Sequence, residues 1–350
     1  MGKFFCAQNG GEKMRFEQVK KEYVDEALSI AVREYEDACK ENNELIQEDF
    51  RSEIRGLLEM LFEKGLGKVA IEEEKVIGYL AFFGPIKGFH GLTVGAFSPL
   101  GGSGFTGEKR EKLASRLFES VSSELMKQGI LTFAISYYSY DKEIGSSLVL
   151  NGFGIRCSDA IMKLETRKLV KQNEQFDYME LMNEERKEIH SLPWKLAKHL
   201  YKAPTFYPTS LERFANSIID ENKRVFVAKE RVSQQVVGYI MMENEAAETF
   251  VTGHQKMANI CGAFVEEEHR GNGVAEGILS YICQKIEEEG YLYLGVDCET
   301  LNPTALRFWR KYFRPYTYSY IRRLDERVKG WEDYYNNFMQ NAPLNNVHIL

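Results

Sequence analysis

The segment Arg270-Gly271-Asn272-Gly273-Val274-Ala275 carries more information about this chain than any other stretch of its sequence. An apolar stretch typical of a strand, 260–265, precedes it, and an amphipathic stretch typical of a helix, 276–289, follows it. The two glycines allow a tight turn and a close approach of the backbone to a ligand. The free N–H groups at the start of the helix, together with the helix dipole, favour an anion at this turn, and a diphosphate suits it.

A glycine-rich turn between a strand and a helix also occurs without any ligand, so its surroundings decide between the two interpretations. A second glycine cluster, Gly102, Gly104 and Gly107, has the spacing of a dinucleotide-binding fingerprint. A hairpin precedes this cluster instead of a β-α-β unit, and no acidic residue ends a strand about 20 residues further on, since the next predicted strand ends near Asp141. We therefore interpret 270–275, and not 102–107, as the ligand loop.

The chain contains an internal repeat. Two five-residue segments recur 160 positions later: 76–80 reappears at 236–240, and 163–167 reappears at 323–327. A third match, between 95–97 and 262–264, has an offset of 167. Three matches in one order indicate two copies of a single unit.

Each copy has the predicted order β-α-α-β-β-β-α-β-α-β, which is a mixed α/β fold with a mostly antiparallel sheet flanked by helices. In the first copy the helices are expected at 24–39 and 50–64, and in the second at 184–201 and 210–222. The predicted domains are 1–168 and 169–330. The tail, 331–350, contains aromatic residues spaced for a short amphipathic helix that packs on the body.

Composition excludes several functional classes. The 350 residues carry a net charge of −7, which argues against nucleic acid as a partner. The six cysteines are scattered and form no C-x-x-C pair, so we expect no metal site. No segment is apolar over the roughly 18 residues that a membrane span requires, and the N-terminus lacks a leader pattern. We therefore expect a cytoplasmic protein.

The loop and its surroundings resemble the GNAT superfamily of acetyl-CoA-dependent N-acetyltransferases. The family signature is Q/R-x-x-G-x-G/A, and Arg270, Gly273 and Ala275 match it. Asn302 follows the next predicted strand, Ala305 comes three residues later, and an aromatic-rich helix continues from there, as in the family. The resemblance covers 224–327 strongly. It extends to the first copy through the repeat and the strand order, as in tandem GNAT proteins.

This resemblance implies acetyl-CoA as cosubstrate and a small-molecule or peptide amine as acceptor, with direct attack of the amine on the thioester. The loop 270–275 would hold the pyrophosphate, main-chain groups of Phe264 and Val265 would pair with pantetheine, and Asn302 and Trp309 would complete the cofactor site. The first copy has no arginine at the place that we match to Arg270, so we expect it to be degenerate.

The proton chemistry departs from the family pattern. The usual acid is a tyrosine seven residues after the asparagine, and that position is Trp309. Tyr312 is a possible substitute, although it also fits a packed aromatic residue. Glu266, Glu299 and His254 are candidate bases. A non-catalytic acyl-CoA-binding module is the main alternative, and a peptidoglycan-type or aminoacyl transferase is a third interpretation.

Overall fold

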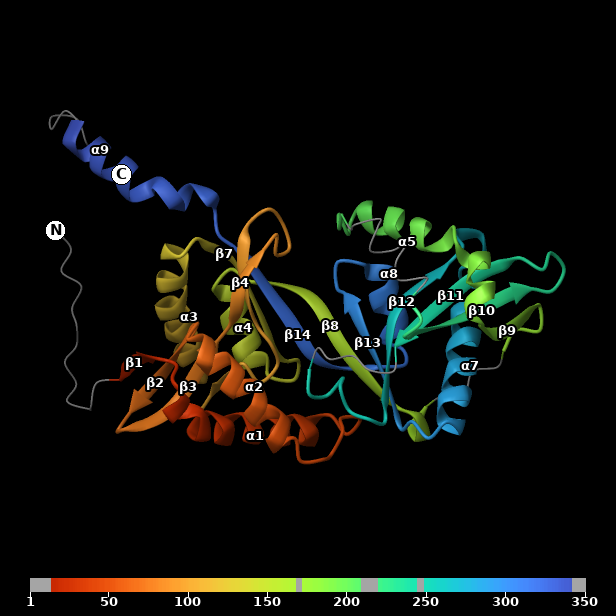
Figure 1. Ribbon diagram of the computed structural model, residues 1–350, viewed down its shortest axis with the longest axis horizontal. Helices are drawn as coiled ribbons and strands as arrows, with labels where there is room; N and C mark the ends of the chain where they lie inside the picture. The colour runs from red at the N-terminus through yellow and green to blue at the C-terminus, as the bar shows by residue number, and fades with distance from the viewer. Residues whose placement is uncertain (1–13, 168–171, 209–219, 244–248, 342–350) are drawn as a thin grey trace.

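The computed structural model describes residues 14–167, 172–208, 220–243 and 249–341. It confirms the mixed α/β fold, with sheets flanked by helices (Figure 1). One sheet of ten strands runs through both halves in the order β4-β5-β7-β14-β8-β13-β12-β11-β10-β9, and a smaller sheet has the order β1-β2-β3-β6.

The first half contains most of the elements that its sequence predicts. They are β1 (Arg15–Gln18), α1 (Val24–Glu41), α2 (Arg51–Lys64), β2 (Gly67–Glu72), β3 (Lys75–Ala81), β4 (Phe83–Lys87), β5 (Val94–Ser98), β6 (Ser103–Phe105), α3 (Arg110–Lys127), β7 (Ile130–Tyr138), α4 (Lys142–Leu150) and β8 (Gly154–Lys163). Helix α2 buries Ile54, Leu58 and Leu61, which lie on one face at helical spacing.

The second half follows a similar order. Where the first half has three strands between its hairpin and the next helix, β4, β5 and β6, the second half has one, as predicted. Its elements are β9 (Phe176–Leu181), the 3-10 helix η3 (Asn183–Ile189), α5 (Leu192–Tyr201), β10 (Lys223–Glu230), β11 (Val236–Glu243), β12 (Met257–Val265), η4 (Glu267–His269), α7 (Val274–Glu288), β13 (Tyr293–Glu299), α8 (Pro303–Trp309) and β14 (Arg314–Arg323). The single helix expected at 184–201 is divided into η3 and α5, because Pro193 starts a new helix. Most of the helix expected at 210–222 lies outside the described residues.

Helices cover both faces of the sheet in the second half (Figure 1). Successive residues of β10 point to opposite faces, as in any strand. Phe226 packs in one core cluster with Ile278 and Ile282 of α7, whereas Val225 and Val227 pack in another with Leu192 of α5. The packing of Ile278 and Ile282 against one face of the sheet holds α7 in place, and α5 packs on the other face.

The closing strands of the two halves are exchanged. Strand β8 of the first half pairs with β13 of the second, with Asp159 opposite Asp297. Strand β14 of the second half pairs with β7 of the first, with Tyr320 opposite Ile135. The sequence analysis expected one sheet for each half. The exchange merges them, because β8 and β14 also pair with each other.

The register of the strands corrects one sequence match and one prediction that followed from it. Gly78 pairs with Phe105 in the first half, and Gly238 pairs with Val265 in the second, so Phe105 is the counterpart of Val265. The match of 95–97 with 262–264 is therefore wrong. The same offset of 160 makes Arg110 the counterpart of Arg270, so the prediction that the first half lacks this arginine is also wrong.

The glycine cluster of the first half belongs to strand packing. Gly104 lies within β6, which pairs with β3. A Cβ atom at Gly104 would approach side-chain atoms of Ile30 and Tyr79 to 2.8 Å, so a larger residue would not fit. This crowding explains Gly104 without a ligand.

The C-terminal helix α9 (Trp331–Asn341) leads away from the body (Figure 1). Trp331, Tyr334 and Tyr335 are exposed, so the expectation that this tail packs on the body is wrong. Within the described part of the chain, no helix combines the length and the apolar character that a membrane span requires.

Candidate functional site

A groove opens where two neighbouring strands of the second half separate. Strands β12 and β13 pair in parallel from Met257 with Tyr293 to Ile260 with Val296, and no further pair follows along β12 in the described residues. The register between β11 and β12 also shifts at Cys261. A pocket of about 780 Å³ lies at this opening, lined by residues of β12 from Cys261 to Val265 and of β13 from Asp297 to Glu299.

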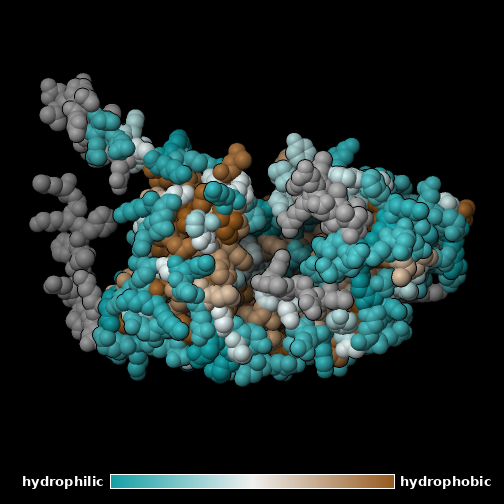
Figure 2. Space-filling view, in the orientation of Figure 1, coloured by the Kyte–Doolittle hydropathy of each residue, from teal (hydrophilic) through white to brown (hydrophobic). Residues whose placement is uncertain are grey.

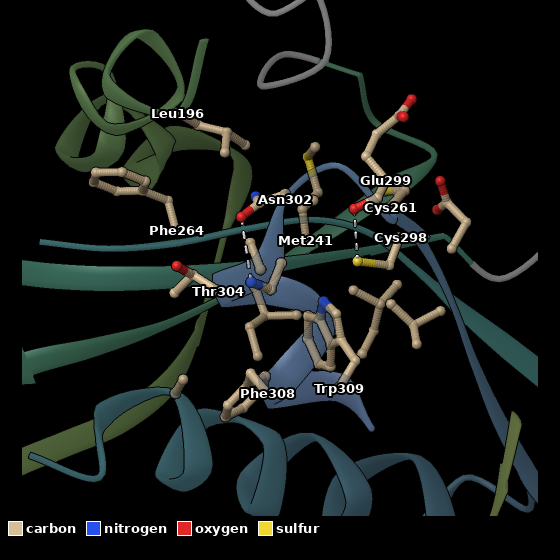
Figure 3. A pocket seen from close by; sticks show the side chains of 18 of the residues that line it. Leu196, Met241, Cys261, Phe264, Cys298, Glu299, Asn302, Thr304, Phe308 and Trp309 are labelled. Atoms are coloured by element: carbon tan, nitrogen blue, oxygen red, sulfur yellow. Dashed lines mark hydrogen bonds between the residues drawn. The ribbon is translucent and has the colours of Figure 1, made fainter. Parts of the chain in front are cut away.

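Figure 3 shows the arrangement of the side chains in this pocket. Cys298 and Glu299 lie together at one side of the view, and Phe264 with Leu196 lies at the other. Asn302 is placed between them, and Trp309 lies below. In the space-filling view, the surface is hollowed between the two halves and apolar side chains lie in the hollow (Figure 2).

The glycine-rich loop borders one end of the pocket. Gly271 and Gly273 have φ angles of +82° and +77°, which side chains other than glycine rarely adopt. Helix α7 begins directly afterwards, and no side chain caps its first turn. The first N–H groups of α7 are therefore available to an anion.

Arg270 fastens this loop to the end of β12. Its Nε donates to the Val265 carbonyl at 3.0 Å, and its guanidinium lies 5.4 Å from the centre of the Phe264 ring. Six predicted cofactor residues of this region line the pocket: Phe264, Val265, Arg270, Gly271, Val274 and Ala275. Asn272 and Gly273 shape the loop through their backbone instead, and the Asn272 carbonyl accepts a hydrogen bond from Asn173.

Helix α8 contributes the other two predicted cofactor residues. The Asn302 side chain caps this helix by accepting a hydrogen bond from the Ala305 N–H at 3.3 Å. Trp309 is buried and makes edge contacts with Phe308 and Phe313. Both Asn302 and Trp309 line the pocket.

The three predicted catalytic residues are not brought together. Glu299 lines the pocket. Tyr312 packs against Phe308, with ring centres 5.4 Å apart, and burial raises its pKa. His254 lies near the first half, where its Nε2 is 3.2 Å from Glu48. Neither Tyr312 nor His254 is among the described residues that line the pocket.

Two cysteines of the pocket are poor nucleophiles. Burial raises the pKa of the Cys261 thiol to about 12, and nearby Glu243 and Asp297 contribute to this shift. Burial likewise raises the pKa of Cys298 to about 12, with contributions from Asp297 and Glu299. Both thiols stay protonated at neutral pH, so neither supplies a thiolate.

The charges of the lining differ between its parts. Most cations come from the loop and from the region of α8, namely Arg270, Arg307 and Lys311, and most carboxylates come from β8, β11 and β13, namely Asp159, Glu243, Asp297 and Glu299. Each side also has one charge of the opposite sign: Lys223 lies 3.9 Å from Glu243, and Glu276 lies 3.9 Å from Lys311. The sequence analysis missed Asp159, because this residue belongs to the first half and enters the pocket only through the strand exchange.

Comparisons with known proteins bear on the family and on the fold. The model of the family described as "Acetyltransferase (GNAT) family" matches residues 185–313. A GCN5-related N-acetyltransferase from Sphaerobacter thermophilus has a similar structure, with 12% identity, a TM-score of 0.56, and coverage of 89% of this chain and 95% of that one. No curated protein matches the sequence.

A second solved structure is described as the GCN5-related glucosamine N-acetyltransferase region of a fungal multi-domain GH3 beta-N-acetylglucosaminidase. It has 11% identity and a TM-score of 0.50, with 89% of this chain and 38% of that chain covered. At these identities the likeness concerns the fold alone.

The family assignment rests on the match to the family model. By this match, residues 185–313, in the C-terminal half of this chain, form a domain of the acetyltransferase (GNAT) family.

Proposed function

We propose that this protein transfers an acetyl group from acetyl-CoA to a primary amine of a small molecule or peptide, in the pocket of its C-terminal half. One observation carries the proposal. The uncapped start of α7, reached through Gly271 and Gly273, borders a pocket that lies where β12 and β13 separate. Family membership of 185–313 supports acyl transfer in general.

Acetyl-CoA would bind along this opening. The N–H groups at the loop 270–275 would receive the pyrophosphate, with Arg270 adding positive charge. The edge of β12 from Cys261 to Val265 that faces β13 has no strand partner among the described residues, so its main-chain groups can pair with the amides of pantetheine. Asn302 and Trp309 would then flank the inner part of the bound cosubstrate.

The acceptor would approach from the carboxylate-lined side. Ammonium groups are attracted to Asp159, Asp297 and Glu299 there, whereas the polyanionic cosubstrate favours the side of Arg270. This difference in charge orients the two reactants toward each other, and holding them together supplies much of the rate.

Glu299 is the candidate base, because it is the only one of the three predicted bases that lines the pocket among the described residues, whereas Glu266 is paired with Lys195. It would take the proton of the ammonium group directly or through a water molecule. The amine then attacks the thioester carbonyl, and main-chain N–H groups stabilise the oxyanion. The thiolate of CoA can leave without an enzymatic acid, since an ordinary thiol has a pKa of about 8.5.

A non-catalytic acyl-CoA-binding module is the second candidate. Trp309 favours it, because an indole cannot supply the proton that the family tyrosine supplies, and Tyr312 lies outside the described lining. The cytoplasmic location stays a prediction from the sequence.

Calorimetric titration and a thiol-release assay test the two candidates. We expect acetyl-CoA to bind saturably, and thiol release to exceed background hydrolysis with at least one member of a panel of primary amines. A lack of saturable binding below about 1 mM would contradict both candidates. Saturable binding without amine-dependent thiol release would favour the binding module.

A further inference from the structure

A side chain of the first half lies between two residues that line the pocket of the second. Arg156, on the exchanged strand β8, directs its Nε to Glu299 Oε2 at 3.2 Å and its Nη2 to Glu299 Oε1 at 3.3 Å. Its guanidinium carbon lies 4.6 Å from the centre of the Tyr207 ring. Glu299 and Tyr207 both line the pocket, and Arg156 is not among its described lining residues.

The backbone around this stack is fixed by hydrogen bonds between the halves. The Thr300 N–H donates to the Arg156 carbonyl at 2.8 Å, and the Thr300 hydroxyl donates to the Ile155 carbonyl at 2.7 Å. The hydroxyl of buried Thr205 donates to the Leu301 carbonyl. The segment that carries Glu299 is therefore held against β8, and the segment that carries Tyr207 is held to it through Leu301.

Arg156 is the cation that the structure places against the Glu299 carboxylate. Asp297 and Asp159 line the same part of the pocket, and like charges repel at short range. The side chains of Arg156 and Glu299 are only 14% and 22% exposed, so solvent screens their attraction less than at an open surface. A forked guanidinium also fixes the direction of a carboxylate, which an ammonium group does less well.

We propose that Arg156 is a positioning residue for acyl transfer: it aims the Glu299 carboxylate into the pocket and braces the Tyr207 ring beside it. This inference rests on the proposed function. It gives the first half a direct part in the reaction, since the exchanged strand supplies a residue without which the acceptor side of the pocket is incomplete.

The test is a double-mutant cycle in the full-length chain. The variants are Arg156→Met, Arg156→Lys, Glu299→Gln and the Arg156→Met/Glu299→Gln double variant. The matched control is Arg167→Met, which removes another arginine that joins the halves, through Glu287, outside the described lining. The acceptor is the amine with the fastest thiol release among spermidine, tyramine, glucosamine, lysine and a short peptide with a free N-terminus.

We expect Arg156→Met to lower kcat/KM for the amine by about 10- to 100-fold, as loss of positioning does. The Kd for acetyl-CoA and the Tm should stay near the wild-type values, Arg156→Lys should recover part of the loss, and Arg167→Met should be fully active. The double variant should lose no more activity than Glu299→Gln alone, because Arg156 acts through Glu299.

Other outcomes would contradict either the positioning role of Arg156 alone or the proposed function as well. An active wild type with unchanged kcat/KM in Arg156→Met overturns the positioning role and leaves the proposed function intact. Losses that add in the double variant, or that come with weaker acetyl-CoA binding, also overturn it, since they indicate a general structural role. A wild type that acetylates none of the amines overturns the proposed function and this inference together.

Discussion

The two halves have the same arrangement where a strand passes into a helix, β6 into α3 and β12 into α7, but different residues surround this point. Arg110 donates from Nε to the Phe105 carbonyl at 3.1 Å, and Arg270 donates from Nε to the Val265 carbonyl at 3.0 Å. In the first half α3 begins at Arg110 itself, whereas in the second half three loop residues separate Arg270 from α7. The second half thus gains an open glycine loop where the first has a helical turn.

The facing helix shows the same contrast. Asp141 caps α4 as Asn302 caps α8. In the first half Arg110 bonds Asp141 directly, at 2.7 Å, whereas Arg270 and Asn302 both line the pocket. The pocket that lies between these two positions in the second half is therefore replaced in the first half by an ion pair.

Glu34 of α1 completes this closure. Its buried carboxylate accepts hydrogen bonds from the Phe105 N–H at 2.9 Å and from the Tyr137 hydroxyl at 2.6 Å. The main-chain N–H at the end of β6 is thus bonded to a carboxylate of the protein itself. The end of β6 is the counterpart of the end of β12. The first half thus encloses a carboxylate of its own at the place where we propose that the second half binds the anionic part of acetyl-CoA. We propose that the first half is a degenerate copy that binds no acetyl-CoA.

Substitution of the two corresponding arginines, Arg110 and Arg270, should have the largest effects on stability and on acetyl-CoA binding. Arg110→Met should lower the free energy of unfolding by about 3–5 kcal/mol, because it leaves the buried carboxylates of Glu34 and Asp141 without their cation. Arg270→Met should change stability by less than about 1 kcal/mol but weaken acetyl-CoA binding by about tenfold. Denaturant unfolding and calorimetry measure both quantities, and equal effects of the two variants on either quantity would contradict the comparison.

The pH dependence of stability should be smaller and specific to the first half. Burial raises the pKa of Glu34 from 4.5 to about 7, although Tyr137, Phe105 and Arg110 oppose the shift. Between these values the folded state binds more protons than the unfolded state, so this group makes stability fall as pH rises from 4.5 to 7. The fall is at most about 3 kcal/mol. Urea midpoints of Glu34→Gln should lack this component, and a curve parallel to that of the wild type would contradict the assignment.

Local patterns in the sequence were enough to predict most of the elements and the position of the glycine loop. The spacing of Ile54, Leu58 and Leu61 identifies α2, and the placement of Gly271 and Gly273 between a strand and a helix identifies the loop. Both patterns extend over only a few residues, so they do not depend on contacts with distant parts of the chain.

Features that depend on distant partners could not be predicted. Side chains alternate between the two faces of a strand in the same way whether it pairs with its own half or with the other. Residues 154–163 therefore do not indicate that β8 brings Asp159 and Arg156 to the pocket of the second half. Glu34 gives no sign that it meets Phe105, 71 residues away. His254 was assigned by its chemistry alone, and its neighbour Glu48 is 206 residues distant.

A matched pair of glycines tests the central claim most directly. Gly273 and Gly107 both have positive φ angles, +77° and +86°, and a Cβ atom would meet nothing within 4 Å at either. An aspartate would therefore impose a similar backbone strain at both positions, of about 1–2 kcal/mol. Only at Gly273 would it place a negative charge at the loop that we assign to the pyrophosphate.

The measurement is a calorimetric titration of acetyl-CoA into the wild type, Gly273→Asp and Gly107→Asp. The account predicts one site per chain in the wild type, wild-type affinity in Gly107→Asp, and a loss of at least about 100-fold in Gly273→Asp. Two sites per chain, or an affinity that survives in Gly273→Asp and falls in Gly107→Asp, would contradict it.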